Sequence, residues 1–282
     1  MTRVVCVLSG GGAKTAAHLG ALRALYERGL QPSHYVASSM GAVVAAAAAA
    51  GVDYDVQLDR LLRLRRRDVA VLSPKALMGL YGRGLFRPEP LRRTIAALVP
   101  AKRFQDLGVP LTVTVVDLDS GELVLLGAGG RDDVPLHDAL LATCALPIYY
   151  PPAVIDGRRY VDGGLRAVLP IDVAARFQPD VIFAVDVGPG FDELPAERRS
   201  PIPPLVRLHG EVLRVMMAAQ TKATLAAWSG RGEPRLIVVR PAVQAETTFA
   251  LDKAPLYVEE GYRAAMRALG GEVRFGGGKS EA

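Results

Sequence analysis

Cysteine, aromatic residues and long apolar runs are all scarce in this 282-residue sequence. Its two cysteines, Cys6 and Cys144, cannot form a disulfide framework, and each lies in an apolar run that is typical of a buried thiol in a reducing compartment. The longest apolar run, 42–51, is about half of the roughly 18 residues that a membrane-spanning helix needs. The sequence therefore excludes a disulfide-stapled scaffold and predicts no membrane-spanning helix.

A secretory signal is also missing from the N-terminal residues. The sequence MTRVVCVLSGGG carries one arginine and a short apolar run that ends in glycines, where a signal peptide would have a cleavage site of small residues. We therefore expect the mature chain to begin here. We also expect a cytoplasmic location, with peripheral contact with a membrane left open by the charge pattern.

Basic residues outnumber acidic ones by 34 to 29, which gives a net charge of +5. A positive net charge can serve binding to nucleic acid, binding to an anionic membrane or solubility, and the charge alone does not distinguish them. The sequence has no nucleic-acid motif, so we expect no nucleic-acid partner. Much of the excess lies in 59–72, DRLLRLRRRDVAVL, where leucines share one helical face. Arg60, Arg63 and Arg67 there indicate either a solvated helix face or a contact with an anionic membrane surface.

The first fifty residues alternate between strand and helix patterns. A β-branched run at 3–9 ends in three glycines and is followed by a helical pattern over 14–30. A second strand pattern begins at His34, and an alanine-rich helix pattern follows Ser39. Repeated strand-turn-helix units predict a mostly parallel sheet covered by helices, and half of the residues are apolar, enough for a sizeable core.

The rest of the chain continues this pattern. The segment 52–107 is mostly helical but broken by prolines and glycines, and we expect it to cap a site. Further elements are predicted as follows: hairpins over 109–127 and 153–162, helices over 136–142, 205–228 and 255–269, strands at 179–188 and 236–240, and a mobile loop over 188–204. We expect one α/β domain over 1–270 and a flexible tail over 271–282.

Ser39 is the first candidate for chemistry. It lies between a predicted strand and a predicted helix, where a sharp turn exposes the hydroxyl and the helix N-terminus stabilises negative charge, as in the GxSxG nucleophile elbow. Here the five residues are ASSMG, with Gly41 kept after the serine and Ala37 in place of the first glycine. A serine in this position is also a common helix N-cap, so this motif alone leaves both interpretations open.

A glycine triplet at 10–12 follows the first predicted strand. Successive backbone N–H groups there can point into one concavity, as in an oxyanion hole or an anion site. A phosphate-binding P-loop would need glycine directly before Lys14 and again five residues earlier, where the sequence has Ala13 and Leu8. The triplet therefore favours anion stabilisation by backbone amides over nucleotide binding.

A nucleophilic serine needs a base, and the sequence offers four histidines and one well-placed aspartate. His18, His34, His137 and His209 have no obvious catalytic placement. Asp162 stands at the exit of a predicted hairpin in VDGG, where two glycines permit a tight turn that presents the carboxylate. We therefore prefer Asp162 as the base, although an Asp-Gly pair is often only a turn.

Together these motifs resemble those of the patatin-like phospholipase family. SGGGAK is similar to its glycine-rich motif, ASSMG to its serine elbow and VDGG to its Asp-Gly-Gly motif, in the family's order. The stretches TCALPIYYPPAVIDGRRYVDGG and VVDLDSGELVLLGAGG are also similar, so that the resemblance covers about 3–190. It implies a patatin-like three-layer α/β/α sandwich and hydrolysis of acyl esters in phospholipids or related lipids.

The resemblance also implies the role of each matching residue. Ser39 would attack the ester, Asp162 would act as base without a histidine, and Gly10, Gly11 and Gly12 would hold the oxyanion. It implies no metal and no cofactor. The positions that would support the elbow and the loop are Lys14, Gly41, Gly163 and Gly164. Two residues depart from the family pattern, Ala37 and Thr15. The alternatives are a catalytically impaired lipid-binding protein, or an acyltransferase that uses the same acyl-enzyme.

Overall fold

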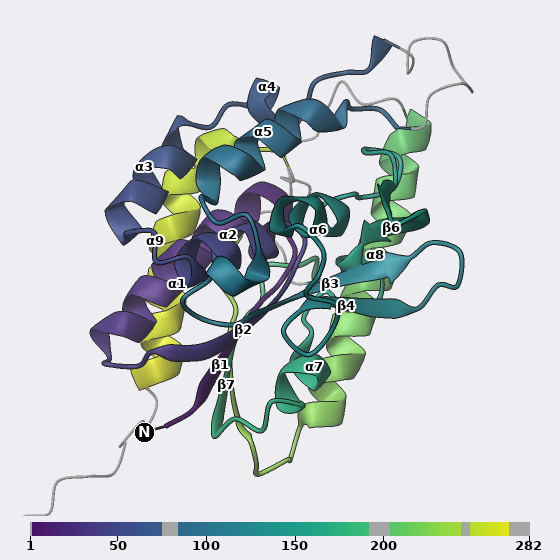
Figure 1. Ribbon diagram of the computed structural model, residues 1–282. Coiled ribbons are helices and arrows are strands. Elements are labelled where there is room, and N and C mark those ends of the chain that lie inside the picture. The colour runs from purple at the N-terminus through teal and green to yellow at the C-terminus, as the bar shows by residue number, and fades with distance from the viewer. Residues whose placement is uncertain (1, 75–83, 192–203, 244–248, 271–282) are drawn as a thin grey trace, which may run out of the picture.

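A central sheet lies between two layers of helices (Figure 1). The computed structural model describes residues 2–74, 84–191, 204–243 and 249–270. The strands are β1 (Val4–Leu8), β2 (Pro32–Ser38), β3 (Leu111–Asp117), β4 (Leu123–Gly127), β5 (Ala153–Ile155), β6 (Arg158–Asp162), β7 (Val181–Val185) and β8 (Arg235–Val239). The helices are α1 (Ala16–Glu27), α2 (Met40–Ala49), α3 (Tyr54–Arg63), α4 (Arg66–Val69), α5 (Pro88–Leu98), α6 (Leu136–Thr143), α7 (Ile171–Ala175), α8 (Pro204–Trp228) and α9 (Ala254–Gly270).

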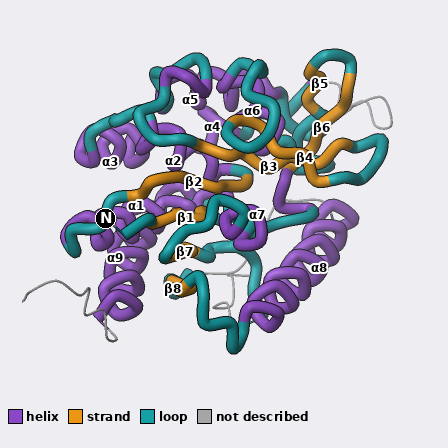
Figure 2. Tube along the Cα trace, turned by 60° about the horizontal axis from the view of Figure 1, so that its bottom comes forward, coloured by secondary structure: helices purple, strands orange, loops and turns teal. Residues whose placement is uncertain are grey.

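The order of the strands brings three strand ends to one edge of the sheet. The order is β5-β6-β3-β2-β1-β7-β8, with β4 paired to β3, and the pairs among β3, β2, β1, β7 and β8 are parallel. Figure 2 shows these strands in this order between α1 and α9 on one side and α8 on the other. Because parallel strands end at the same edge, the turns after β1, β2 and β7 lie together.

The register places the end of β6 beside the end of β2. Ser38 pairs with Thr114 of β3, and the next residue of β3, Val115, pairs with Asp162 of the antiparallel strand β6. The residue after Ser38 and the last residue of β6 are therefore neighbours across β3. Because β3 pairs in parallel with β2 and antiparallel with β6, it brings the two candidate catalytic side chains close together.

Alternate residues of the strands build two separate cores. In β1, Val4, Cys6 and Leu8 belong to the large cluster under α1, α2, α6 and α9, whereas Val5 and Val7 face the cluster that includes α7. The strand is buried on both faces, as expected at the centre of a parallel sheet.

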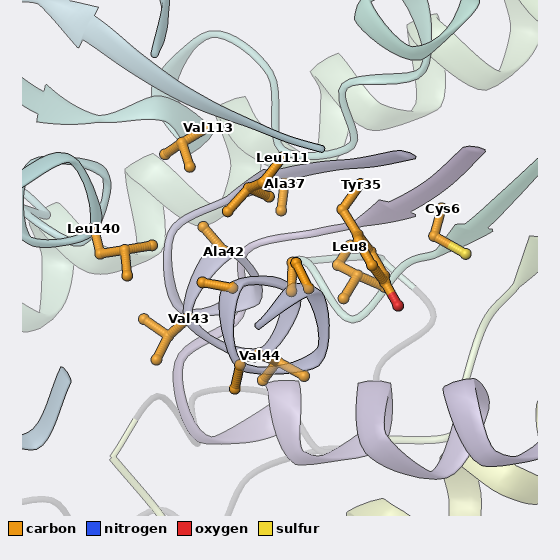
Figure 3. Packing of buried hydrophobic residues seen from close by; sticks show 14 of the residues in the cluster. Cys6, Leu8, Tyr35, Ala37, Ala42, Val43, Val44, Leu111, Val113 and Leu140 are labelled. Atoms are coloured by element: carbon orange, nitrogen blue, oxygen red, sulfur yellow. The ribbon is translucent and has the colours of Figure 1, made fainter. Parts of the chain in front are cut away.

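The alanine-rich sequence of α2 lets that helix lie close to the strands. Figure 3 shows Ala42 and Val43 of α2 with Ala37 of β2 and Leu111 of β3 in the same buried cluster. All four side chains are at most 1% exposed. Small side chains on the helix therefore bring its N-terminus, and the turn before it, against the edge of the sheet.

The three-layer α/β fold, its mostly parallel sheet and both predicted hairpins are confirmed. The first helix begins later than predicted, because residues Gly12–Thr15 form a 3₁₀ turn and α1 starts at Ala16. Helix α7 was not predicted, since five residues carry too little periodicity. Most of the predicted loop over 188–204 and the tail over 271–282 lie outside the described residues, and the single domain over 1–270 stays a prediction. Among the helices of the described ranges, none combines the length and hydropathy needed to cross a bilayer.

Candidate active site

Ser39 occupies a strained turn between β2 and α2. Its backbone has φ 52° and ψ −140°, a conformation that non-glycine residues rarely adopt. Its N–H donates to the Thr143 hydroxyl at 2.8 Å. The turn is tight enough that a Cβ at Gly41 would lie 2.3 Å from the Ser9 carbonyl oxygen, so only glycine fits there. The strand and the helix thus approach closely and present the serine hydroxyl between them.

The elbow forms although Ala37 replaces the first glycine of the pattern. The Ala37 side chain is fully buried in β2 and remains in register with Leu8 and Val113 on the neighbouring strands. The extra methyl group is therefore accommodated in the core without interrupting the strand.

Asp162 ends β6 and faces the Ser39 hydroxyl. Its Oδ2 accepts a hydrogen bond from Ser39 Oγ at 2.6 Å, and its Oδ1 accepts one from the N–H of Gly164 at 2.8 Å. The side chain is buried, and this loss of hydration raises its pKa from 3.8 to about 6, although the two hydrogen bonds lower the pKa. The carboxylate is therefore ionised at neutral pH yet more basic than an exposed aspartate.

Gly163 and Gly164 allow this approach. A Cβ at Gly163 would lie 2.2 Å from the carbonyl oxygen of Thr114, so glycine is needed where β6 meets β3. Gly164 supplies the N–H that orients Asp162 and lies against the Met217 side chain of α8. The turn after β6 thus fixes both the position and the hydrogen bonding of the carboxylate.

The glycine triplet forms a loop beside this pair. A Cβ at Gly10 would lie 3.0 Å from Ser39 Cβ, and Gly12 has φ 59°. The N–H of Gly10 donates to the Val168 carbonyl at 3.3 Å. The amide of Gly10 is thus bonded within the fold, and Gly11 and Gly12 line the cavity described below.

Side chains near the loop hold its shape. Ser9 Oγ donates to the Gly10 carbonyl and accepts from the N–H of Val187. Thr15, a departure from the family pattern, donates its hydroxyl to the Gly12 carbonyl at 2.7 Å and so closes the 3₁₀ turn. Lys14 is buried and lines the cavity described below. These bonds make the loop a preformed part of the fold.

Three of the four histidines bond to groups other than Ser39. The Nε2 atoms of His18, His34 and His137 bond to the Ser9 carbonyl, the Thr112 hydroxyl and the Val99 carbonyl, and His209 Nε2 is buried with no hydrogen-bond partner among the described residues. Burial lowers the pKa of His18 to about 4, which leaves it neutral. In the described part of the chain, Asp162 is the carboxylate that meets the serine hydroxyl, and no histidine does.

Ser39 and Asp162 lie in the wall of a cavity of about 790 Å³. Its apolar wall follows α2 from Met40 to Ala47 and includes Leu61 of α3 and Leu98 of α5. The capping role expected for 52–107 agrees with this position of α3 and α5. The charged lining comprises the cations Lys14, Arg65, Arg66, Arg207, Arg214 and Lys253 and the carboxylates Asp162, Glu211 and Asp252. The cavity thus combines an apolar wall with an excess of positive charge.

The arginines singled out by the sequence lie on the outside of this region. Arg60 donates to the Ala97 carbonyl at 3.0 Å, and Arg63 pairs with Asp59 at 2.8 Å on exposed surface. Arg67 is exposed. A membrane contact through these three residues stays a prediction.

Sequence reasoning gave no role at the site to three residues beside the pair. Thr143, at the end of α6, accepts the hydrogen bond from the N–H of Ser39, Cys144 after it contacts Met40, and Met217 of α8 lies against Gly164. Of these, the first two lie in the stretch TCALPIYYPP, whose similarity to a family segment marked the region without giving either side chain a role. The described residues contain no group of three or more His, Cys, Asp or Glu that could hold a metal ion.

The arrangement has the parts needed for nucleophilic attack on an acyl group. A buried carboxylate accepts the hydrogen of the half-buried Ser39 hydroxyl, the glycine loop lies beside the serine, and a cavity with an apolar wall adjoins both.

The chain belongs to the patatin-like phospholipase family. The family model matches residues 6–175, which include the glycine loop, the elbow and Asp162. The chain is 32% identical over 200 residues to an NTE family protein of Mycobacterium tuberculosis, with 71% of this chain and 52% of that protein covered. The chain thus spans about half the length of this curated relative.

The chain is also similar to more distant proteins. The human patatin-like phospholipase domain-containing protein 6 is 26% identical over 187 residues, which cover 66% of this chain and 13% of that protein. Among solved structures, VipD from Legionella pneumophila has a TM-score of 0.48 and 16% identity, with 95% of this chain and 67% of that chain covered.

Proposed function

We propose that the protein is a serine esterase that cleaves acyl ester bonds of phospholipids or related lipids through Ser39 and Asp162. The observation that carries the proposal is the 2.6 Å hydrogen bond from Ser39 Oγ to a buried carboxylate whose pKa is raised to about 6. A base in this range is ionised at neutral pH and accepts a proton more readily than an ordinary aspartate.

The reaction proceeds through an acyl-enzyme. Ser39 Oγ attacks the ester carbonyl carbon while its proton passes to Asp162 Oδ2. The carbonyl oxygen becomes an oxyanion, which the N–H groups of Gly11 and Gly12 stabilise. When the tetrahedral intermediate collapses, the bond to the leaving alcohol breaks and Asp162 returns the proton to that alcohol. A water molecule then attacks the acyl group, gives a proton to Asp162, and releases the carboxylic acid as Ser39 regains its hydrogen.

The cavity supports a lipid as the source of the acyl group. Its wall along α2 begins at Met40, directly after the nucleophile, and continues through Val43 to Ala47, a rise of roughly 10 Å along the helix. This surface suits an acyl chain whose ester lies at Ser39. The excess of cations elsewhere in the lining suits an anionic group on the same molecule.

A catalytically impaired lipid-binding protein is the main alternative, because Ala37 and Thr15 depart from the family pattern. Two observations favour the enzyme. Ala37 leaves β2 in register, and Thr15 closes the turn of the glycine loop without occupying the Ser39 hydroxyl. An acyltransferase would use the same acyl-enzyme, and it differs only in the alcohol that takes the acyl group from Ser39.

The test is release of fatty acid from phospholipid in mixed detergent micelles, followed by mass spectrometry. We expect the wild type to release fatty acid and the Ser39→Ala variant to release none above background. Ser38→Ala is the matched control, because the neighbouring Ser38 hydroxyl is buried and has no hydrogen-bond partner within the described ranges. Addition of glycerol or a lysolipid distinguishes the transferase, which would form a new ester. Equal release by the wild type and Ser39→Ala would refute the proposal.

A further inference from the structure

The strained elbow at Ser39 needs an external contact to hold it. Its φ of 52° is unfavourable for a residue that has a Cβ, and the residue here is serine instead of glycine, which adopts such a φ without strain. A strained residue persists only where its surroundings fix it. The side chain of Ser39 does not cap α2, so its own hydroxyl does not supply the fixing contact.

Thr143 supplies a direct contact to this backbone. Its hydroxyl oxygen accepts the hydrogen bond from the N–H of Ser39 at 2.8 Å and donates to the Thr114 carbonyl at 2.7 Å. Thr143 is fully buried, and Thr114 pairs in register with Ser38. The hydroxyl therefore bridges the strained turn to the central strand β3 beside it.

The same short segment also holds the other half of the pair. The Ala145 carbonyl, two residues after Thr143, accepts a hydrogen bond from the N–H of Asp162 at 3.1 Å. The end of α6 thus bonds to the backbone of Ser39 through a side chain and to the backbone of Asp162 through a carbonyl. These two contacts together fix the separation of the two backbones that carry the reacting side chains.

We propose that Thr143 is a positioning residue, whose hydroxyl holds the Ser39 elbow in the conformation that aims Oγ at Asp162. The proposal rests on the proposed function, because it assigns Thr143 a part in the reactivity of Ser39. Thr143 touches neither substrate nor the transferred proton. Its loss removes the partner of the Ser39 N–H, and the turn then relaxes toward a less strained conformation in which Oγ points away from the carboxylate.

The primary variant is Thr143→Val, which keeps the shape of the side chain and removes the hydroxyl. Thr143→Ser restores the hydroxyl without the methyl group. The matched control is Thr112→Val, since the Thr112 hydroxyl is equally buried, accepts from His34 Nε2 at 2.8 Å and donates to the Ala128 carbonyl at 2.5 Å. Thr112 pairs with Val36, three residues before the nucleophile, so its loss tests a buried threonine bridge away from the elbow.

The measurements are kcat and KM for p-nitrophenyl butyrate and the rate constant for inactivation by a fluorophosphonate. For Thr143→Val we expect both kcat and the inactivation rate constant to fall by about tenfold to a hundredfold, because a misplaced nucleophile loses reactivity steeply. We expect KM to stay within about twofold, and the midpoint of the pH profile to stay near that of the wild type, because the titrating group is unchanged. Thr143→Ser should recover most of the rate and Thr112→Val should retain it.

Equal kcat in Thr143→Val and the wild type would overturn the proposal, as would an equal loss in Thr112→Val, which would indicate a general effect of removing a buried hydroxyl. If Thr143→Val does not fold, Thr143→Ser and Thr143→Cys provide the test, since they differ in one atom and a thiol is a weak acceptor. A lower kcat in the cysteine variant supports the proposal, and equal values overturn it. If the wild type itself does not react with the fluorophosphonate, the proposed function is wrong, and the role of Thr143 fails with it.

Discussion

Two aspartates at strand ends of the same sheet have nearly the same backbone contact, but they differ in their other partners. Asp162 is the last residue of β6 and Asp186 follows β7, both are buried, and each accepts a hydrogen bond from the N–H two residues later, at 2.8 and 3.0 Å. The second oxygen of Asp186 pairs with the guanidinium of Arg240, whereas that of Asp162 faces the Ser39 hydroxyl. A buried carboxylate beside a cation forms a structural ion pair, whereas one beside a hydroxyl can take the proton of that hydroxyl.

The largest expected effect comes from removing the basic oxygen. Asp162→Asn keeps the size of the side chain but cannot accept the proton of Ser39, so kcat for p-nitrophenyl butyrate should fall by about a hundredfold to ten-thousandfold. Steady-state kinetics at pH 8 measures the loss. A fall of less than about tenfold would show that Asp162 is not the base.

The same substitution should stabilise the fold at high pH. The pKa of Asp162 is raised in the native state from 3.8 to about 6. Proton binding by Asp162 therefore stabilises the folded protein fully below about pH 3.8, and this stabilisation is lost as the pH rises through 6. At pH 8 the ionised carboxylate opposes folding, and Asn removes that cost, about 1 to 3 kcal/mol. Urea unfolding should show the gain at pH 8 and little of it at pH 4. An equal or lower stability at pH 8 would contradict the raised pKa.

Removal of the cation from the second carboxylate should affect stability, not chemistry. Arg240→Met leaves the buried Asp186 without its arginine and should lower the free energy of unfolding by about 2 kcal/mol, less than for a fully buried pair because Arg240 is partly exposed. Arg159→Met is the control, since Arg159 pairs with Asp119 on exposed surface and should cost less than about 0.5 kcal/mol. Urea unfolding compares the two. Equal losses would show that burial of the carboxylate does not matter here.

The pH dependence of activity should report the raised pKa of Asp162. The reactive form carries an ionised carboxylate, so kcat/KM should rise with pH through a midpoint of about 6 and gain about tenfold between pH 5 and pH 7. A stopped assay with p-nitrophenyl butyrate across this range measures the profile. A midpoint near 4 would place Asp162 in an ordinary hydrated environment and would remove the contrast with an unburied aspartate.

A cation placed near Asp162 should lower the pKa of its carboxylate. Met217 lies against Gly164, next to the carboxylate, and Met217→Lys should lower the midpoint of the pH profile by about one unit or less. Met216→Lys adds the same charge at a side chain that is 62% exposed, and should leave the midpoint unchanged. If both variants shift the midpoint equally, the effect comes from net charge and not from proximity.

Local patterns were enough to predict most of the fold. The alternation of β-branched runs with glycine turns and helical patterns predicted the strands β1, β2 and β7, and the Asp-Gly pair at 156–157 predicted the β5–β6 hairpin. The turn at Ser39 and the end of β6 at Asp162 were predicted for the same reason, since both follow strands and are marked by glycines. Helix α7 escaped because its five residues are too few to show a period.

Contacts between distant segments were not predictable from these patterns. Thr143 lies 104 residues from Ser39, and the N–H of Gly10 is occupied by Val168, which follows the other half of the site along the chain. The absence of a cation beside Asp162 among the described contacts depends on the register of β6 against β3, although Arg158 and Arg159 are close to it in sequence. Burial and strand register determine these contacts, and neither can be predicted from a local sequence motif.

The most direct test of the Ser39–Asp162 pair is the mass of the intact protein after incubation with a fluorophosphonate, with the modified peptide then identified. The wild type should gain one adduct on Ser39, Ser39→Ala should gain none, and Asp162→Asn should form the adduct much more slowly, because the hydroxyl has lost its base. An adduct of equal mass and rate on Ser39→Ala, or a wild type that stays unmodified while it is folded, would contradict the assignment of Ser39 as the nucleophile.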